Sequence, residues 1–146
     1  MKKVPWLWII AAAAWLGFIW WHSLQPASVS SQQSGAVLEE LTALFSALHL
    51  PDVLDMHLVR KLAHGIEYAV LGLLLAGACG GWKAVWPARL WGALSGCLAA
   101  AVIDETIQLF VEGRSGQISD LWVDLAGALL GIAAAMAVIG LRKKHR

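Results

Sequence analysis

Four long apolar segments constrain this chain more than any other feature of its sequence. They run from Trp6 to Trp21, from Leu62 to Trp82, from Leu90 to Phe110 and from Leu121 to Leu141. A helix needs roughly 20 mostly apolar residues to cross a hydrocarbon core about 30 Å thick. Only 14% of the residues are charged and 59% are hydrophobic, so the sequence predicts an integral membrane protein. The expected fold is all-α, a single domain over residues 1–146 with a bundle of four transmembrane helices.

The first apolar segment follows Lys2 and Lys3, an arrangement that also begins many signal peptides. No clean small-x-small cleavage pattern follows it, so residues 5–21 are expected to remain as an N-terminal membrane anchor. The second and third segments are joined only by the stretch GWKAVWPAR. Such a short connection predicts a tight antiparallel pair of helices.

The charged residues are distributed unevenly between the two ends of the expected bundle. One end carries the basic residues Lys2, Lys3, Lys83, Arg89, Arg142, Lys143, Lys144 and Arg146. The other end has Arg60, Lys61 and Arg114, and all 10 acidic residues lie on or near it. The positive-inside rule therefore predicts cytoplasmic termini and places the opposite end outside. A net charge of +1 gives no indication of a nucleic-acid partner.

Residues 22–59 are then expected to form an extracytoplasmic loop. Its first part, SLQPASVSSQQSG, is polar and typical of flexible chain. The following stretch, AVLEELTALFSALHL, has apolar residues at helical spacing, with Ser34 as a candidate N-cap. The pattern predicts a short amphipathic helix on the outer membrane surface, which Pro51 and Asp52 end before the next helix begins. Its apolar positions are Val37, Leu41, Leu44 and Leu48.

Polar residues gather near the outer ends of three of the expected spans. At about 1.5 Å per residue, Glu67, Asp104 and Asp124 lie roughly 4–9 Å inside the ends of their helices. Three helices thus bring polar groups to a similar depth, with Arg114 just above them near the headgroups. The polar set comprises Lys61, His64, Glu67 and Tyr68 in the second span, Asp104, Glu105 and Gln108 in the third, and Asp120 and Asp124 in the fourth.

A charged side chain inside the membrane costs about 2.5–3.5 kcal/mol even on the most lenient scale. These residues should therefore face the bundle interior, pair with each other or contact a polar ligand. The acids outnumber the nearby bases, so we expect some carboxylates to be protonated or to face a cation or a basic ligand group. The sequence predicts a polar pocket open to the outside and to the outer leaflet.

Small residues mark one stripe of the fourth span. Gly127 and Gly131 are spaced as in small-xxx-small motifs, and Ala134 and Ala135 continue the stripe. Such motifs let two helix backbones approach closely. The fourth span is therefore expected to pack tightly against a neighbouring helix.

Two separated stretches also resemble a known family. RKLAHGIEYAVLGLLL and DETIQLFVEGRSGQISDLWVDLAGALLG, within Arg60 to Gly131, resemble the VanZ-like family of small bacterial membrane proteins. The resemblance covers about half the chain, a motif core over residues 60–131, and implies a multi-pass protein of the bacterial cytoplasmic membrane. Asp124 stands where many members carry Asn, and Glu112 where many carry Pro. The family is named after a member linked to teicoplanin resistance, and the resemblance supplies no biochemical activity.

The resemblance and the depth argument select the same candidate site residues. The candidates for catalysis or ligand binding are Lys61, His64, Glu67, Asp104 and Glu105, and the candidates for ligand binding are Tyr68, Gln108, Arg114, Asp120 and Asp124. Each also has a purely structural reading. Asp120 suits a helix N-terminus, and Arg114 could pair with Glu112. Lys61, His64 and Tyr68 could form an interfacial stripe that reaches the headgroups, whereas a pairing of His64 with Glu67 favours a functional role.

Two functions remain open on the sequence alone. The first is a binding protein that holds a phospholipid or a lipid-linked cell-wall precursor and affects glycopeptide susceptibility. The alternative is an enzyme that modifies a lipid headgroup or such a precursor by acid/base chemistry. The absence of a complete nucleophile–base pair favours binding. The histidines show no zinc-type spacing, so no metal and no cofactor are expected, although His64, Glu67, Asp104 and Glu105 form a conceivable metal set.

Overall fold

The computed structural model describes residues 6–51, 53–80 and 85–144. Within these residues the chain forms five helices and no strand. They are α1 (Trp6–Ser23), α2 (Ala27–Ala47), α3 (Met56–Gly80), α4 (Trp86–Gln108) and α5 (Ile118–Lys144). All but α2 contain a stretch long and apolar enough to cross a membrane. The predicted all-α fold with four transmembrane helices is confirmed.

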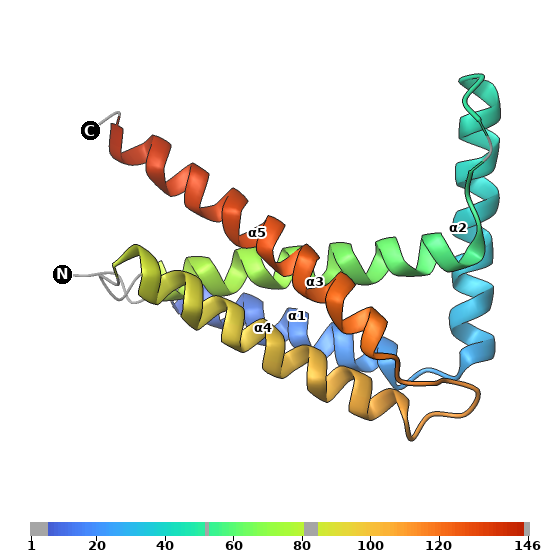
Figure 1. Cartoon of the computed structure of the whole chain (residues 1–146), viewed down its shortest axis with the longest axis horizontal. Helices are drawn as coiled ribbons and strands as arrows, with labels where there is room; N and C mark the ends of the chain where they lie inside the picture. The colour runs from blue at the N-terminus through green and yellow to red at the C-terminus, as the bar shows by residue number, and fades with distance from the viewer. Residues whose placement is uncertain (1–5, 52, 81–84, 145–146) are drawn as a thin grey trace.

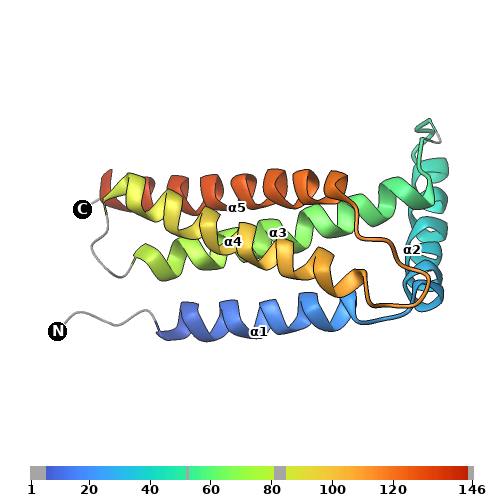
Figure 2. The same cartoon turned by 60° about the horizontal axis from the view of Figure 1, so that its bottom comes forward.

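The four apolar helices run lengthwise through the molecule, and α2 crosses one end of them (Figures 1 and 2). The start of α1, the end of α3, the start of α4 and the end of α5 share one end of the bundle. The opposite end holds α2, the start of α3 and the loop between α4 and α5. Residues 81–84 of the predicted short connection between α3 and α4 lie outside the described residues. This arrangement requires four membrane crossings by the chain.

The closest packing in the bundle joins α3 to α5. A Cβ atom at Gly127 would overlap the backbone carbonyl of Gly65, and one at Gly131 would overlap the carbonyl of Ala69. From the other side, a Cβ atom at Gly72 would meet the carbonyl of Ala128. The two backbones touch along this line because no side chain separates them. The close packing predicted from the small-residue stripe is confirmed.

The crossing helix differs from its expected bounds. We expected a flexible stretch up to about Ser34, but α2 begins at Ala27, directly after Pro26. Pro26 has φ −54° and ψ 152°, and its fixed φ favours the start of a helix immediately after it. The backbone N–H of Ala27 donates to the carbonyl of Glu112 (3.1 Å), which holds this start against the loop between α4 and α5.

The predicted helix boundary at Pro51 and Asp52 is also wrong in detail. The helix α2 ends at Ala47, and α3 begins at Met56, six residues before the expected apolar segment. The carboxylate of Asp55 accepts a hydrogen bond from the backbone N–H of Leu58 (2.7 Å) and thereby caps α3. Asp52 itself lies outside the described residues. The expected apolar segment began only at Leu62 because the charged residues Arg60 and Lys61 precede it.

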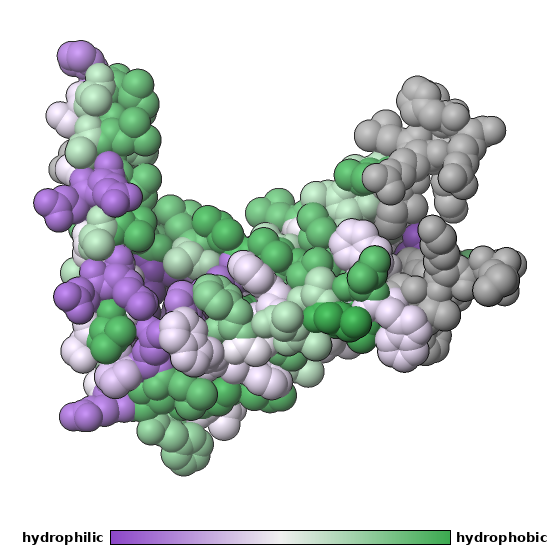
Figure 3. Space-filling model, turned by 180° about the vertical axis from the view of Figure 1, so that it is seen from behind, coloured by the Kyte–Doolittle hydropathy of each residue, from purple (hydrophilic) through white to green (hydrophobic). Residues whose placement is uncertain are grey.

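Along its length, α2 leaves its apolar residues uncovered. None of its residues is buried, and Val37, Leu44 and Leu48 are about half exposed. Figure 3 shows hydrophobic surface on the side of α2 turned toward the length of the bundle and hydrophilic surface on its outer side. An apolar face on this side would meet the membrane beside the bundle, as in helices that lie at a lipid interface.

Candidate functional site

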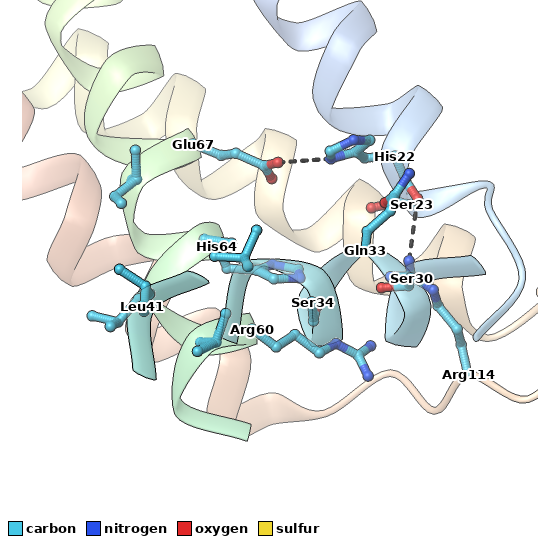
Figure 4. A pocket seen from close by; sticks show the side chains of 15 residues that line it. His22, Ser23, Ser30, Gln33, Ser34, Leu41, Arg60, His64, Glu67 and Arg114 are labelled. Atoms are coloured by element: carbon cyan, nitrogen blue, oxygen red, sulfur yellow. Dashed lines mark hydrogen bonds and ion pairs between the residues drawn. The ribbon is translucent and has the colours of Figure 1, made fainter. Parts of the chain in front are cut away.

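A cavity of about 310 Å³ lies where α2 crosses the bundle (Figure 4). Its polar wall combines His22 and Ser23 from α1, Arg60, His64 and Glu67 from α3, and Arg114 from the loop between α4 and α5. The helix α2 adds Ser30, Gln33 and Ser34, and the apolar part of the wall includes Leu41, Leu62 and Ile66. The cavity thus joins segments from four parts of the chain and has one polar and one apolar side.

Glu67 is fixed by α1 and does not pair with His64. Its Oε1 atom lies 2.9 Å from Nδ1 of His22, and Nε1 of Trp15 donates to the Glu67 carbonyl (2.8 Å). The expected pair of His64 and Glu67 is therefore wrong. Sequence reasoning missed His22. Its position at the end of the first span could have indicated it, because the other polar residues lie near the same end of their spans.

Arg114 braces the connection between α1 and α2. Its Nε donates to the carbonyl of Gln25 (3.0 Å) and its Nη2 to the carbonyl of His22 (3.2 Å). Burial lowers the pKa of the Arg114 guanidinium below its ordinary value, and the positive charge of Arg60 lowers this pKa further. No ion pair with Glu112 is found among the described residues. Arg114 therefore has a structural task and also presents positive charge to the cavity.

Arg60 is a cavity residue that was not among the sequence-based candidates. Figure 4 shows its side chain extending from α3 toward the side on which Arg114 lies. Its Nε is buried without a hydrogen-bond partner among the described residues. Arg60, His64 and Glu67 occupy positions i, i+4 and i+7 of α3, so helical spacing could have placed Arg60 on the face that holds the other two.

Beside the cavity, three helices bring His64, Asp104 and Asp124 together. One candidate ligand atom from each lies within 4.8 Å of the others. Nδ1 of His64 is 3.5 Å from Oδ1 of Asp124, and Nε2 of Gln108 donates to Oδ2 of Asp104 (3.3 Å). The side chain of Asp124 and the whole of Asp104 are 0% exposed. We call His64, Asp104 and Asp124 the buried trio.

The remaining candidates lie around this centre. Lys61 pairs with Asp120 at 3.6 Å, and both border a small pocket of about 40 Å³ beside the main cavity. Oε2 of Glu105 accepts from the backbone N–H of Gln117 (2.6 Å) and so shapes the loop before α5. Tyr68 is fully buried in the hydrophobic core, and its hydroxyl has no hydrogen-bond partner among the described residues. The candidates Lys61, Glu105, Tyr68 and Asp120 therefore do not line the main cavity.

Comparison with known proteins identifies the family but no specific relative. A search among curated proteins finds no match, and neither does a search among solved structures. The family model described as VanZ/LLP1 matches residues 8–139, which is nearly the whole chain and extends well beyond the expected motif core. With its four apolar helices, the chain is a multi-pass membrane protein that belongs to the VanZ/LLP1 family.

Proposed function

We propose that the cavity under α2 binds the phosphate-bearing headgroup of an envelope lipid. The observation that carries this proposal is the pairing of two guanidinium groups, Arg60 and Arg114, with an apolar wall in one cavity. A phospholipid has the matching character, because its anionic phosphate is linked through glycerol to apolar acyl chains. Retention of such a lipid, or of a lipid-linked cell-wall precursor, is our proposed route to any change in glycopeptide susceptibility.

The positive charges support binding of an anion. The positive charge of Arg60 lowers the pKa of Arg114, so the two groups repel each other. The carboxylates of Asp104, Glu67 and Glu105 raise this pKa and offset part of the repulsion. An anion between them would relieve this repulsion, and guanidinium groups bind phosphate through paired, charge-assisted hydrogen bonds. Arg114 already donates two hydrogen bonds to carbonyl groups, whereas Nε of Arg60 has no partner among the described residues and is left for a ligand.

The apolar rim supports access from the membrane. Leu62 and Ile66 of α3 line the cavity and are 50% and 62% exposed, so the cavity has an apolar edge on the exposed side of this helix. Acyl chains could pass over these side chains while the headgroup occupies the polar side near Ser30 and Ser34 of α2. Acyl chains in this position stay in apolar surroundings, so the lipid need not leave the membrane for its headgroup to reach the cavity.

Removal of the Arg60 charge tests the proposal. In Arg60→Gln we expect the affinity of purified protein for phosphatidylglycerol in mild detergent to fall about 10- to 100-fold, the usual effect of losing a hydrogen bond to a charged group. The measurement is a titration followed by native mass spectrometry. Lys61→Gln is the matched control, because Lys61 is adjacent, has the same charge and pairs with Asp120 outside the main cavity.

Equal affinities of the Arg60→Gln and Lys61→Gln proteins, or a wild type that holds no lipid, would contradict the proposal. The same samples separate binding from enzymatic modification. A lipid recovered unchanged after long incubation supports binding, whereas a shortened or altered headgroup would favour the enzymatic alternative. His64→Ala tests the enzymatic alternative further, since a headgroup change that persists in this variant would exclude His64 as the acid or base.

We further propose that the cavity faces the outside of the bacterial cytoplasmic membrane. The basic residues near the start of α1 and the end of α5 support this orientation by the positive-inside rule. We expect alkaline phosphatase fused after Gln117 to be active and a green fluorescent protein fused after Arg146 to be fluorescent. Exchanging the two reporters is the control and should silence both. Active phosphatase after Arg146 would reverse the orientation and remove the cavity from the outer face.

A further inference from the structure

We propose that the buried trio, His64, Asp104 and Asp124, binds a first-row divalent transition-metal ion. The motivating observation is their convergence from α3, α4 and α5, with one ligand atom of each within 4.8 Å of the others. This site lies beside the lipid cavity but differs from it in chemistry. The inference does not rest on lipid binding, because metal binding can be measured in lipid-free detergent.

Unmet bonding capacity marks the trio as a site for a ligand. Both carboxylate oxygens of Asp124, Oδ1 of Asp104 and Nδ1 of His64 are buried without a hydrogen-bond partner among the described residues. The separation of 3.5 Å between His64 and Asp124 is too long for a good hydrogen bond. A buried polar atom without a partner destabilises the fold because it has lost its hydrogen bonds to water. A bound cation would satisfy all of these atoms at once.

The charge of the trio points to a cation. Two carboxylates face one imidazole inside apolar helices, and no other basic side chain of the described residues lies within ion-pair distance of Asp104 or Asp124. An unbalanced charge inside the membrane is strongly unfavourable. A divalent cation would balance both carboxylates with His64 neutral, which is the form of histidine that binds metals.

The ligand types favour a transition metal. Imidazole nitrogen suits Zn²⁺ and related ions, whereas Mg²⁺ and Ca²⁺ prefer oxygen ligands alone. Ligands at about 2.0–2.2 Å from a tetrahedral zinc lie roughly 3.4 Å apart, close to the separation of His64 and Asp124. The ligand atoms of the trio lie up to 4.8 Å apart, and rotation of the two carboxylates would bring them closer together.

The surroundings of Asp104 resemble those of a metal-binding carboxylate. Gln108 donates to Oδ2 of Asp104, which leaves Oδ1 for another partner. Hydrogen bonds of this kind orient the ligands in metal sites. His64 also lines the lipid cavity, so a metal held here would be accessible from that side. The sequence-based set of His64, Glu67, Asp104 and Glu105 differs because Glu67 pairs with His22 and Glu105 accepts from the loop.

Metal binding to chelator-treated protein tests the inference. We expect the folded wild type to bind about one equivalent of Zn²⁺ by calorimetry and by elemental analysis after desalting, and to bind Mg²⁺ far more weakly. Asp104→Asn and Asp124→Asn should each weaken Zn²⁺ binding about 100-fold or more. Glu67→Gln and Asp120→Asn, which change carboxylates outside the trio, are the matched controls and should bind Zn²⁺ like the wild type.

Cobalt spectroscopy keeps the test valid if an asparagine variant fails to fold. Co²⁺ bound to wild-type protein should give visible bands of a four- or five-coordinate ion, and Asp124→Cys should add a sulfur-to-cobalt charge-transfer band. A folded wild type that binds no stoichiometric Zn²⁺ or Co²⁺ would overturn the inference, because the carboxylates would then be neutralised by protons alone. Equal Zn²⁺ binding by folded Asp124→Asn and the wild type would also overturn it.

Discussion

Gly131→Leu is expected to separate α5 from α3 and to prevent formation of the folded bundle. Even a Cβ atom at Gly131 would overlap the carbonyl of Ala69, and this atom belongs to the backbone of α3. No change of side-chain rotamer can therefore relieve the overlap. The two helices would have to move apart along the line that also joins Gly127 to Gly65. We expect a loss of about 4 kcal/mol or more in the free energy of unfolding.

The measurement is unfolding by increasing fractions of sodium dodecyl sulfate in mixed micelles, followed by tryptophan fluorescence. Gly17→Leu is the matched control, because a Cβ atom at Gly17 on α1 meets no atom within 4 Å. This control should unfold close to the wild-type midpoint. A Gly131→Leu protein that unfolds at the same detergent fraction as Gly17→Leu would show that α3 and α5 do not depend on this contact.

Arg114→Gln is expected to have the second-largest effect, confined to the end of the bundle that α2 crosses. The change removes two hydrogen bonds, to the carbonyls of His22 and Gln25, each worth about 1.5–3 kcal/mol for a charged donor. These bonds hold the turn from which α2 begins. We therefore expect amide hydrogen exchange in α2 to quicken about 10-fold or more, while exchange in the buried part of α3 stays unchanged.

Mass spectrometry of exchanged peptides provides the measurement. Arg114→Lys should rescue only part of the protection, because one ammonium group lacks the fork of donors that reaches both carbonyls. Glu112→Gln changes an exposed side chain on the same loop and serves as the control. If amide exchange in α2 is unchanged in Arg114→Gln, the backbone hydrogen bond from Ala27 to Glu112 is sufficient to hold the start of α2.

The sequence predicted the features that depend on the positions of residues along a single helix. The four spans follow from length and hydropathy, and the glycine stripe of α5 predicted its tight contact. Depth along each helix also placed Asp104 and Asp124 at a common level, and the structure brings both to His64. Each of these predictions needs only distances along one helix, which the 1.5 Å rise per residue supplies.

The rotation of one helix against another was not predictable in the same way. The helix α1 is apolar around its whole circumference, so no periodicity indicated that His22 would face Glu67 on α3. The pairing of His64 with Asp124 required the same missing information. The early start of α2 escaped prediction for another reason, because a stretch rich in serine and glutamine has no apolar face to reveal a helix.

The crossing helix has a consequence for how the protein responds to bilayer thickness. With 21 residues, α2 is about 31 Å long and lies across the direction of the spans. A helix whose apolar face rests on the lipid surface follows that surface when the bilayer becomes thinner or thicker. Pro26 and the loop contact at Glu112 tie α2 to one end of the bundle. A mismatch between bundle length and bilayer thickness is then expected to fall at the opposite end. The cavity and the buried trio are therefore expected to keep a constant depth below the membrane surface on which α2 lies, in membranes of different composition.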